Sequence, residues 1–181
     1  MKKQKRIKYL MTALIVIMVV SVGYLSLNQC YQNKMQRQRV VTQDALIKSE
    51  VQTAVSMLQG IYDKHLQGTY STSQAEKLGA DLLRGLRYNG DGYFFADTTE
   101  GVNVVLFGSD VEGTNRLDAS LNGVDYVKEI LLKGTEADGG YTNYWFPKKD
   151  GTEAKAKRAY SLLFEPFGWV VGTGYYLEDI K

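Results

Sequence analysis

The chain has 181 residues, of which 44% are hydrophobic and 23% are charged. This composition excludes a disordered chain, and the length allows one domain with a sizeable core. The net charge is +2, but five cations precede residue 10 with no acid among them; the rest keeps 17 of the 22 bases against 20 acids. Such a mildly acidic remainder has no electrostatic reason to bind nucleic acid.

The first feature along the chain is an apolar run, LMTALIVIMVVSVGYLSL, from Leu10 to Leu27. About 18 uncharged residues are at the lower end of what spans a bilayer as a helix, and the preceding cations should stay in the cytoplasm. No small-residue cleavage site follows, and Gln29 is not the small residue that a lipoprotein needs before its acylated cysteine. We predict a cytoplasmic basic tail at 1–9, an uncleaved transmembrane signal anchor at 10–29 and an extracytoplasmic domain at 30–181.

A long helix is predicted to follow. No proline occurs from Asn28 to Leu66, and apolar residues recur there mostly every three or four positions. This helix could pack on its own domain, pair with a second copy of the chain, or do both; we favour both and therefore expect a homodimer. Ser73 and Glu76 then form a capping-box pattern, which predicts a second helix ending near Arg87.

After Arg87 the chain changes to short β-prone stretches separated by turn residues. YFFADT, VNVVLFG, GGYTNYWFP, AKAKRAYSLLFE and WVVGTGYYLED are predicted strands, and VDYVKEILLKG is a predicted amphipathic helix between the second and the third. The order predicts an α+β domain with one antiparallel sheet of about five strands. In the last strand, Gly172 and Gly174 should let neighbouring groups approach closely.

Catalytic and metal-binding patterns are missing from this sequence. It has one cysteine, Cys30, and one histidine, His65, which cannot form a disulfide within the chain, a histidine-rich metal site or a plausible Cys–His pair. No G-x-S-x-G motif and no phosphate-binding glycine loop occurs. We predict no enzymatic activity, no catalytic residues, no metal and no cofactor. Cys30 stays open as a free thiol or as an inter-chain disulfide of a dimer.

Cations on the predicted sheet are the candidates for ligand binding. Arg87 precedes the first strand, and Lys157 and Arg158 are adjacent in the fourth. Successive strand residues face opposite sides, so one of the adjacent pair should point toward the inner face. The alternative is that Arg87 and Lys157 are solvated, or paired with Asp91 or Glu165.

A cation among tyrosines would be costly to bury without an anion. Tyr93, Tyr144 and Tyr160 are placed on the predicted strands near these positions. A small carboxylate would satisfy the cation, and tyrosine hydroxyls would supply further hydrogen bonds, which contribute about 1.5–3 kcal/mol each to a charged group.

Three stretches resemble the single Cache domain of bacterial chemoreceptors and sensor kinases: LRYNGDGYFFADT, GGYTNYWFPKKDG and KAKRAYSLLFEPFGWVVGTGYYLEDI. The last is the most specific, with its F-E-P-F-G-W start, G-T-G centre and acidic-isoleucine finish. The resemblance covers residues 28–181. It implies a PAS-like extracytoplasmic fold, with a long N-terminal helix along a five-stranded antiparallel sheet. Members sense small molecules, often acetate, propionate, pyruvate or lactate.

Carried onto this chain, the resemblance implies that Lys157 or Arg87 holds a ligand carboxylate. Two departures from the family concern this site: Phe107 and Gly108 stand where members commonly have a His-Pro pair, and Ala156 stands before the lysine where a proline is frequent. The expected ligand-binding residues are Arg87, Tyr93, Phe95, Tyr144, Trp145, Lys157 and Tyr160.

The predicted function follows from the resemblance. We expect a single-pass protein of the bacterial inner (plasma) membrane whose domain faces the periplasm or the exterior and senses a small organic acid for chemotaxis or signal transduction. We also expect it to lack the second membrane helix and the signalling module of such receptors. The alternative is a stand-alone, membrane-anchored Cache protein that acts through a partner or through dimerisation.

Overall fold

The computed structural model describes residues 2–149 and 151–180. Backbone contacts divide the chain into two compact units, residues 1–41 and residues 42–181. The helix α1, Lys2–Leu66, contributes to both.

The unit 1–41 consists of helix α1. The sequence predicts a membrane-spanning helix at 10–29, but no helix among the described residues is long and apolar enough to cross a membrane. Several side chains of the predicted span, and those of the predicted tail 1–9 apart from Lys5, lie outside the described residues. Cys30 is exposed as a free cysteine.

The unit 42–181 is built on one antiparallel sheet of six strands. The strands are β1 Arg87–Tyr88, β2 Gly92–Thr98, β3 Asn103–Leu106, β4 Gly140–Pro147, β5 Ala154–Phe164 and β6 Trp169–Tyr176. Their order is β1-β2-β6-β5-β4, with β3 paired to β2. The last strand of the chain therefore lies in the middle of the sheet, between β2 and β5.

The five predicted strands are present as β2 to β6, and the α+β class is confirmed. The sequence missed β1, because two residues are too short to show a period. Arg87 and Tyr88 pair with Tyr93 and Gly92 across the turn that NGDG predicts. Short 3₁₀ helices follow β5 at Glu165–Phe167 and β6 at Leu177–Asp179.

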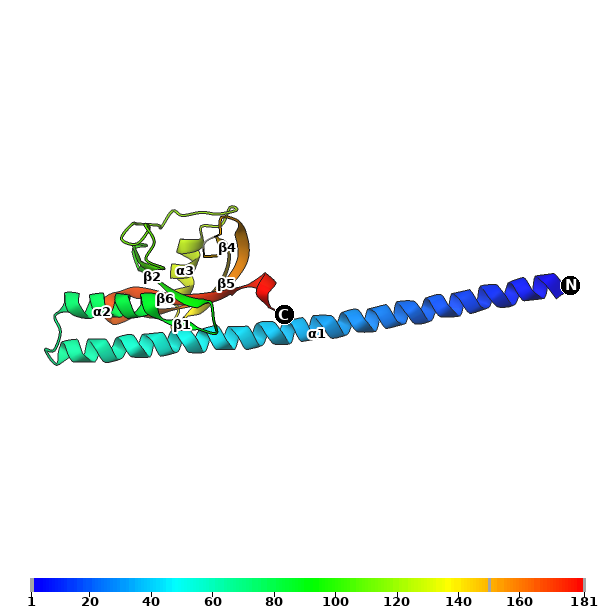
Figure 1. Cartoon of the computed structure of the whole chain (residues 1–181), viewed down its shortest axis with the longest axis horizontal. Coiled ribbons are helices and arrows are strands. Elements are labelled where there is room, and N and C mark those ends of the chain that lie inside the picture. Colours follow the sequence, from blue (N-terminus) through cyan, green and yellow to red (C-terminus); the bar gives the residue numbers. More distant parts are fainter. Residues whose placement is uncertain (1, 150, 181) are drawn as a thin grey trace. The chain divides into compact units, whose positions relative to one another are not determined.

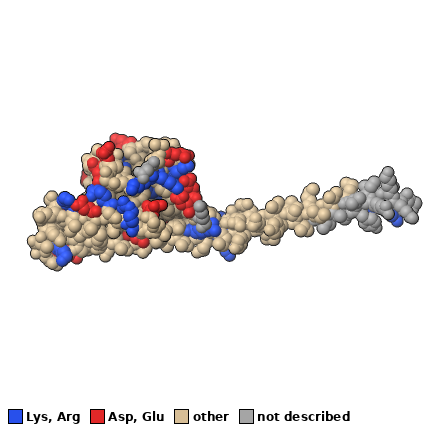
Figure 2. Space-filling model, viewed as in Figure 1, with Lys and Arg blue, Asp and Glu red and all other residues tan. Residues whose placement is uncertain are grey.

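Helices cover both faces of the sheet in this unit (Figure 1). The last turns of α1 and the helix α2, Thr72–Gly85, cover one face, which we call the helix face. The helix α3, Tyr126–Gly134, covers the other together with the long loops, and we call it the pocket face. Lysine, arginine and acidic side chains are intermingled over the visible surface of this unit (Figure 2).

The cap of α2 corrects the sequence analysis. The capping box is formed by Ser71 and Gln74, whereas the pattern Ser73–Glu76 was predicted. The Gln74 N–H donates to Ser71 Oγ at 3.2 Å, and the Ser71 N–H donates to Gln74 Oε1 at 2.8 Å. Glutamine serves as well as glutamate in this motif, so an earlier match in TYSTSQ was overlooked.

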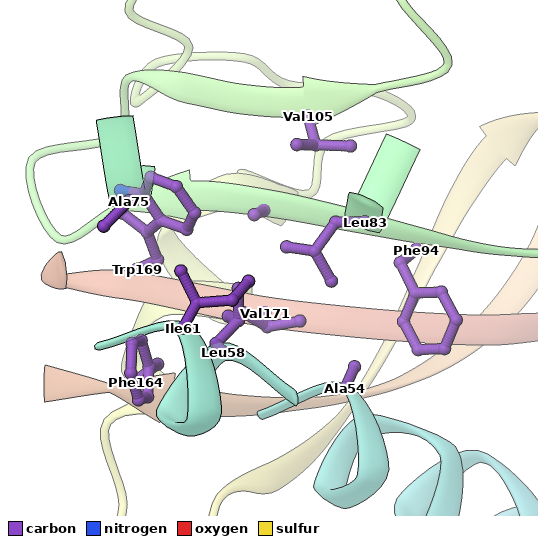
Figure 3. Packing of buried hydrophobic residues seen from close by; sticks show 11 residues of the cluster. Ala54, Leu58, Ile61, Ala75, Leu83, Phe94, Val105, Phe164, Trp169 and Val171 are labelled. Carbon is purple, nitrogen blue, oxygen red and sulfur yellow. The ribbon is translucent and has the colours of Figure 1, made fainter. Parts of the chain in front are cut away.

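The core of the helix face joins α1, α2 and the central strands (Figure 3). Leu58 and Ile61 of α1 and Leu83 of α2 pack against Phe94 and Val171 of neighbouring strands. These apolar residues recur every three or four positions in the helices and every second position in the strands, which is why one layer can bury both. The alternate strand residues are left for the pocket face.

Candidate ligand-binding site

Lys157 is the centre of the candidate site. It lies on the pocket face of β5 and is 1% exposed. Its Nζ donates to the hydroxyl of Tyr93 at 2.5 Å. In the described part of the chain no carboxylate forms an ion pair with it, and desolvation is the cause that acts on its pKa. Burying an ammonium in this way costs desolvation free energy that only a nearby anion can largely offset.

Aromatic rings enclose the Lys157 ammonium. Its Nζ lies 4.3 Å from the ring centroid of Tyr93 and within 5.9 Å of four other centroids. Ring quadrupoles attract a cation, most strongly when water is excluded, and so partly compensate for its burial. The enclosing residues are Tyr93, Phe95, Tyr144, Phe146 and Tyr176.

Burial sets the protonation of this cluster. Desolvation lowers the pKa of Lys157 to about 7, so the side chain is close to its midpoint at neutral pH. Desolvation also raises the pKa of Tyr93, Tyr144 and Tyr176 above the ordinary tyrosine value, so their hydroxyls stay protonated and able to donate. A bound carboxylate would favour the charged lysine.

Two hydroxyl groups of the pocket face lack hydrogen-bond partners among the described residues. The hydroxyls of Thr142 on β4 and Ser161 on β5 are buried and form no hydrogen bond among the described residues. Each shares the face of Lys157 by strand alternation, because Thr142 pairs with Ala159 and Ser161 with Gly140. The pocket face therefore has unused hydrogen-bonding capacity as well as an unpaired charge.

A pocket with a volume of about 720 Å³ lies at the end of the sheet. Tyr93 and Tyr176 line it, but Lys157 does not, so these two rings separate the pocket from the ammonium. Phe107 also lines it and places its ring centroid 3.9 Å from that of Tyr93. A ligand arriving through this pocket reaches Lys157 only if the rings move.

The structure brings together four of the seven residues that the sequence predicts: Tyr93, Phe95, Tyr144 and Lys157. It places neither of the suggested acids with the predicted cations: within the described residues, Asp91 and Glu165 form no ion pair with Lys157 or Arg87.

Arg87 is not among the side chains around Lys157, although its backbone pairs with that of Tyr93 in the β1–β2 ladder. It is exposed, and its Nη1 donates to the main-chain oxygens of Arg84 and Leu86 at 2.9 and 2.6 Å. It lines the pocket at the end of the sheet. Its guanidinium is therefore occupied by the end of α2 and does not reach the Lys157 cluster.

Trp145 and Tyr160 also lie elsewhere, on the helix face. Trp145 is 41% exposed, and Tyr160 packs against Ile47 and Val51 of α1 while its hydroxyl donates to the main-chain oxygen of Asp138. Strand alternation explains both positions, since Trp145 is one position after Tyr144 and Tyr160 is three positions after Lys157, both odd offsets.

Phe146 and Tyr176 are site residues that the sequence analysis missed. Phe146 could have been found, because it lies two positions after Tyr144 and so shares its face. Tyr176 is directly opposite Lys157 in the β5–β6 ladder. That register could not be read from the chain, because it depends on β6 inserting between β2 and β5.

Two arginines near the sheet are paired with acids. Arg116 Nη2 lies 2.8 Å from the fully buried carboxylate of Asp97, and Arg158 Nε lies 2.8 Å from that of Asp44. The Arg116–Asp97 pair ties the loop after β3 to β2 on the pocket face. Lys157 differs from both arginines because its charge is left unpaired.

Comparison with known proteins identifies the domain. The model of the family described as Single Cache domain 2 matches residues 41–181. The chain belongs to this family. The resemblance noted from the sequence is thereby confirmed, and the Cache domain coincides with the compact unit 42–181 to within one residue.

Two longer proteins match most of this chain. Methyl-accepting chemotaxis protein McpP of Pseudomonas putida is 28% identical over 180 residues, which cover 96% of this chain and 31% of that protein. Sensor histidine kinase MctS of Rhizobium johnstonii is 32% identical over 140 residues, which cover 77% of this chain and 30% of that protein. The chain thus spans under a third of each relative's length, and it is a sensor domain related to receptors and kinases of this type.

Solved structures share the Cache fold. A periplasmic sensor domain of a chemotaxis protein superposes with a TM-score of 0.72 at 24% identity, covering 76% of this chain and 96% of that one. A methyl-accepting chemotaxis protein from Vibrio parahaemolyticus gives 0.71 at 23% identity, covering 82% and 97%. A Cache chemosensory domain described for carboxylic acid recognition gives 0.70 at 24% identity, covering 80% and 97%.

Proposed function

We propose that the chain is the extracytoplasmic sensing part of a chemotaxis receptor or sensor histidine kinase, and that it binds a small monocarboxylate at Lys157. The observation that carries this proposal is the buried Lys157 ammonium, which has no acid partner among the described residues and is surrounded by rings. A carboxylate supplies the missing charge, and the hydroxyls of Tyr93 and Tyr144 are protonated donors, whereas the Tyr176 hydroxyl already donates to the main-chain oxygen of Pro147. The solved Cache domain described for carboxylic acid recognition supports this ligand class.

The cluster favours one carboxylate with a short apolar tail. Phe95 and Phe146 present only apolar surface toward Lys157, and the nearby Arg116 is already neutralised by Asp97. The second carboxylate of a dicarboxylate would be desolvated without a cation, at a cost of several kcal/mol. Acetate, propionate and pyruvate satisfy the site, and succinate does not.

We also propose that the segment 10–29 is a membrane anchor and that the Cache domain faces the periplasm. The apolar run and the five preceding cations support the orientation, since positive residues stay on the cytoplasmic side. The relationship to a periplasmic sensor domain points to the same compartment. A homodimer through α1 belongs to this proposal, and crosslinking of the membrane-inserted chain tests it.

Thermal unfolding of the full chain with sodium acetate, propionate, pyruvate and succinate tests the ligand. At a concentration 100-fold above Kd, a ligand that binds only the native state contributes about 2.7 kcal/mol, which raises Tm by about 5–10 °C for a chain of this length. We expect this shift with monocarboxylates, at least tenfold weaker binding of succinate, and no shift in Lys157→Met.

Lys149→Met is the matched control for this experiment. Lys149 lines the open pocket rather than the Lys157 cluster, so its removal should leave the shift intact. Absence of a shift with every monocarboxylate, or an unchanged shift in Lys157→Met, would contradict the proposed site. Loss of the shift in Lys149→Met alone would move the site into the open pocket.

A further inference from the structure

A single acid of α1 fastens this helix to three strands of the Cache domain. The carboxylate of Asp44 accepts from Arg158 Nε at 2.8 Å, from Arg158 Nη2 at 2.9 Å and from the Tyr175 hydroxyl at 2.9 Å. Its main-chain oxygen accepts from the Tyr141 hydroxyl at 3.0 Å. We call Asp44, Tyr141, Arg158 and Tyr175 the Asp44 clamp; in the described part of the unit 42–181 it holds the one ion pair between α1 and the sheet.

The clamp is placed back to back with the candidate ligand site. Lys157 pairs with Tyr176 in the β5–β6 ladder, and the next rung pairs Arg158 with Tyr175. The side chains of Lys157 and Tyr176 lie on the pocket face, and those of Arg158 and Tyr175 lie on the helix face, because consecutive strand residues face opposite sides. In both β5 and β6, a residue of the ligand cluster is therefore the immediate sequence neighbour of a residue of the clamp.

The geometry of the clamp makes it sensitive to small movements of these strands. Arg158 presents two N–H groups to both carboxylate oxygens, and such bidentate pairing depends on orientation. Arg158 also lies over the Tyr141 ring, with 4.7 Å from Cζ to the centroid. A shift or twist of the Lys157–Tyr176 rung is transmitted through the backbone to hydrogen bonds that tolerate little displacement.

We propose that the Asp44 clamp couples occupancy of the Lys157 site to α1. A carboxylate that engages Lys157 and Tyr176 orders the two rungs, tightens the bonds of Arg158 and Tyr175 to Asp44, and so holds the α1 segment after residue 42 more firmly. By linkage, loosening the clamp weakens carboxylate binding by the same factor. This inference rests on the proposed ligand site, and it assigns the route by which that site acts on the helix.

Two tyrosine substitutions separate coupling from simple fastening. Tyr175→Phe and Tyr141→Phe each remove one hydroxyl bonded to Asp44 at nearly equal length. Only Tyr175 is next to a residue of the Lys157 rung, whereas Tyr141 pairs with Tyr160 on β4 and β5. Tyr141→Phe is therefore a matched control for the loss of a hydrogen bond.

The experiment uses the full chain with sodium propionate, calorimetry for Kd, and hydrogen exchange of peptides within residues 42–58. In the wild type we expect propionate to slow exchange there at least threefold. Tyr175→Phe should halve this protection or reduce it further, and should raise Kd about three- to tenfold. Tyr141→Phe should change both quantities less than twofold. Propionate binding without protection of α1, or equal effects of the two variants, overturns the coupling and leaves the proposed ligand site standing.

A second measurement does not depend on any ligand. Lys157→Met is combined with Tyr175→Phe and, separately, with Tyr141→Phe, and the urea midpoint of each variant is compared. Side chains without shared partners add in their effects. Coupling predicts a midpoint for the Lys157–Tyr175 double variant that departs from additivity, and additivity for the Lys157–Tyr141 pair. Additive midpoints in both cycles overturn the inference, even if no carboxylate binds.

Discussion

Lys157 and Arg158 are consecutive cations on one strand, and the sheet places them in opposite environments. Lys157 is buried among rings without an acid, and desolvation lowers its pKa to about 7. The Arg158 side chain is 22% exposed and is hydrogen-bonded to Asp44, whose carboxylate raises the pKa of Arg158 above its usual value. The two residues differ in burial and in whether the fold supplies an anion.

This difference gives the two cations different roles: Arg158 fastens α1 to the sheet, and we propose that Lys157 binds the ligand. A charge that finds its partner within the fold stabilises the packing of α1 on the sheet, as Arg158 does. A charge that the fold leaves unpaired makes the ligand-free domain less stable and creates affinity for an external anion, as we propose for Lys157. Strand alternation allows both roles at adjacent positions without mutual interference.

The largest expected effect is on the pH dependence of propionate binding. Ligand-free Lys157 is charged below its pKa of about 7 and increasingly neutral above it. Because a carboxylate requires the charged form, Kd should rise about twofold from pH 6 to 7 and then approach a tenfold rise per pH unit, reaching about 100-fold its low-pH value by pH 9. Calorimetry in buffers of different ionisation enthalpy should show uptake of close to one proton at pH 9.

The tyrosines of the cluster do not disturb this test. Burial raises the pKa of Tyr93, Tyr144 and Tyr176, so none of them ionises between pH 6 and 9. A Kd that does not change from pH 7 to 9 would show that Lys157 stays charged over this range. Lys157 and Arg158 would then differ only in whether an acid is paired with them.

The second prediction is that removing the two cations changes stability in opposite directions. Lys157→Met should raise the free energy of unfolding of the ligand-free chain by about 1–3 kcal/mol at pH 7, because a buried unpaired charge is replaced by an apolar side chain of similar length. Arg158→Met should lower it by about 1–3 kcal/mol, since Asp44 loses its partner in a half-buried setting. Urea unfolding measures both.

The gain from Lys157→Met should also depend on pH. The native pKa of Lys157 lies below that of the unfolded chain, so the unfolded state binds more protons between about pH 7 and 10.5 and wild-type stability from this group rises across that window. The advantage of the variant is therefore greatest at and below pH 7 and is lost toward pH 10.5. A Lys157→Met variant that is less stable than wild type at pH 7 would contradict the proposed contrast between Lys157 and Arg158.

The third prediction concerns packing rather than charge. A Cβ on Gly172 would lie 2.4 Å from Phe95 Cζ and 2.7 Å from Ser161 Oγ, both on the pocket face. Gly172→Ala should cost about 1–3 kcal/mol of stability by overpacking. Gly60→Ala, on an open surface of α1 with no atom within 4 Å of the added Cβ, should gain about 0.5–1 kcal/mol. If Gly172→Ala and Gly60→Ala change Tm equally, the residues of the pocket face around Gly172 can rearrange to accommodate the added methyl group.

The smallest expected effect tests alternation at a second pair of neighbours, Tyr144 and Trp145 on β4. Trp145→Ala should leave the Kd for propionate within about twofold, because this side chain lies half-exposed on the helix face. Tyr144→Phe removes a hydroxyl from the cluster around Lys157 and should raise Kd about three- to tenfold. A larger effect from Trp145 than from Tyr144 would place the ligand on the other face.

Much of the fold could be read from local patterns. Apolar spacing located α1, α2 and α3, and β-prone runs between turn residues located β2 to β6. The close approach expected at Gly172 and Gly174 is confirmed, since added Cβ atoms there would lie 2.4 Å from their neighbours. The errors were local too: the two-residue β1 was too short to detect, and the cap of α2 begins at Ser71.

The site was only partly readable for a different reason. The sequence determined that two adjacent cations on a strand must face opposite ways, but it could not say which would meet an acid. Asp44 is 114 positions from Arg158, and Tyr93 is 64 positions from Lys157. Only the tertiary structure, by inserting β6 between β2 and β5 and laying α1 across one face, decided that Arg158 is paired and Lys157 is not. Hydrogen-bond register and helix packing bring distant segments together, and no local period of the chain encodes which segments meet.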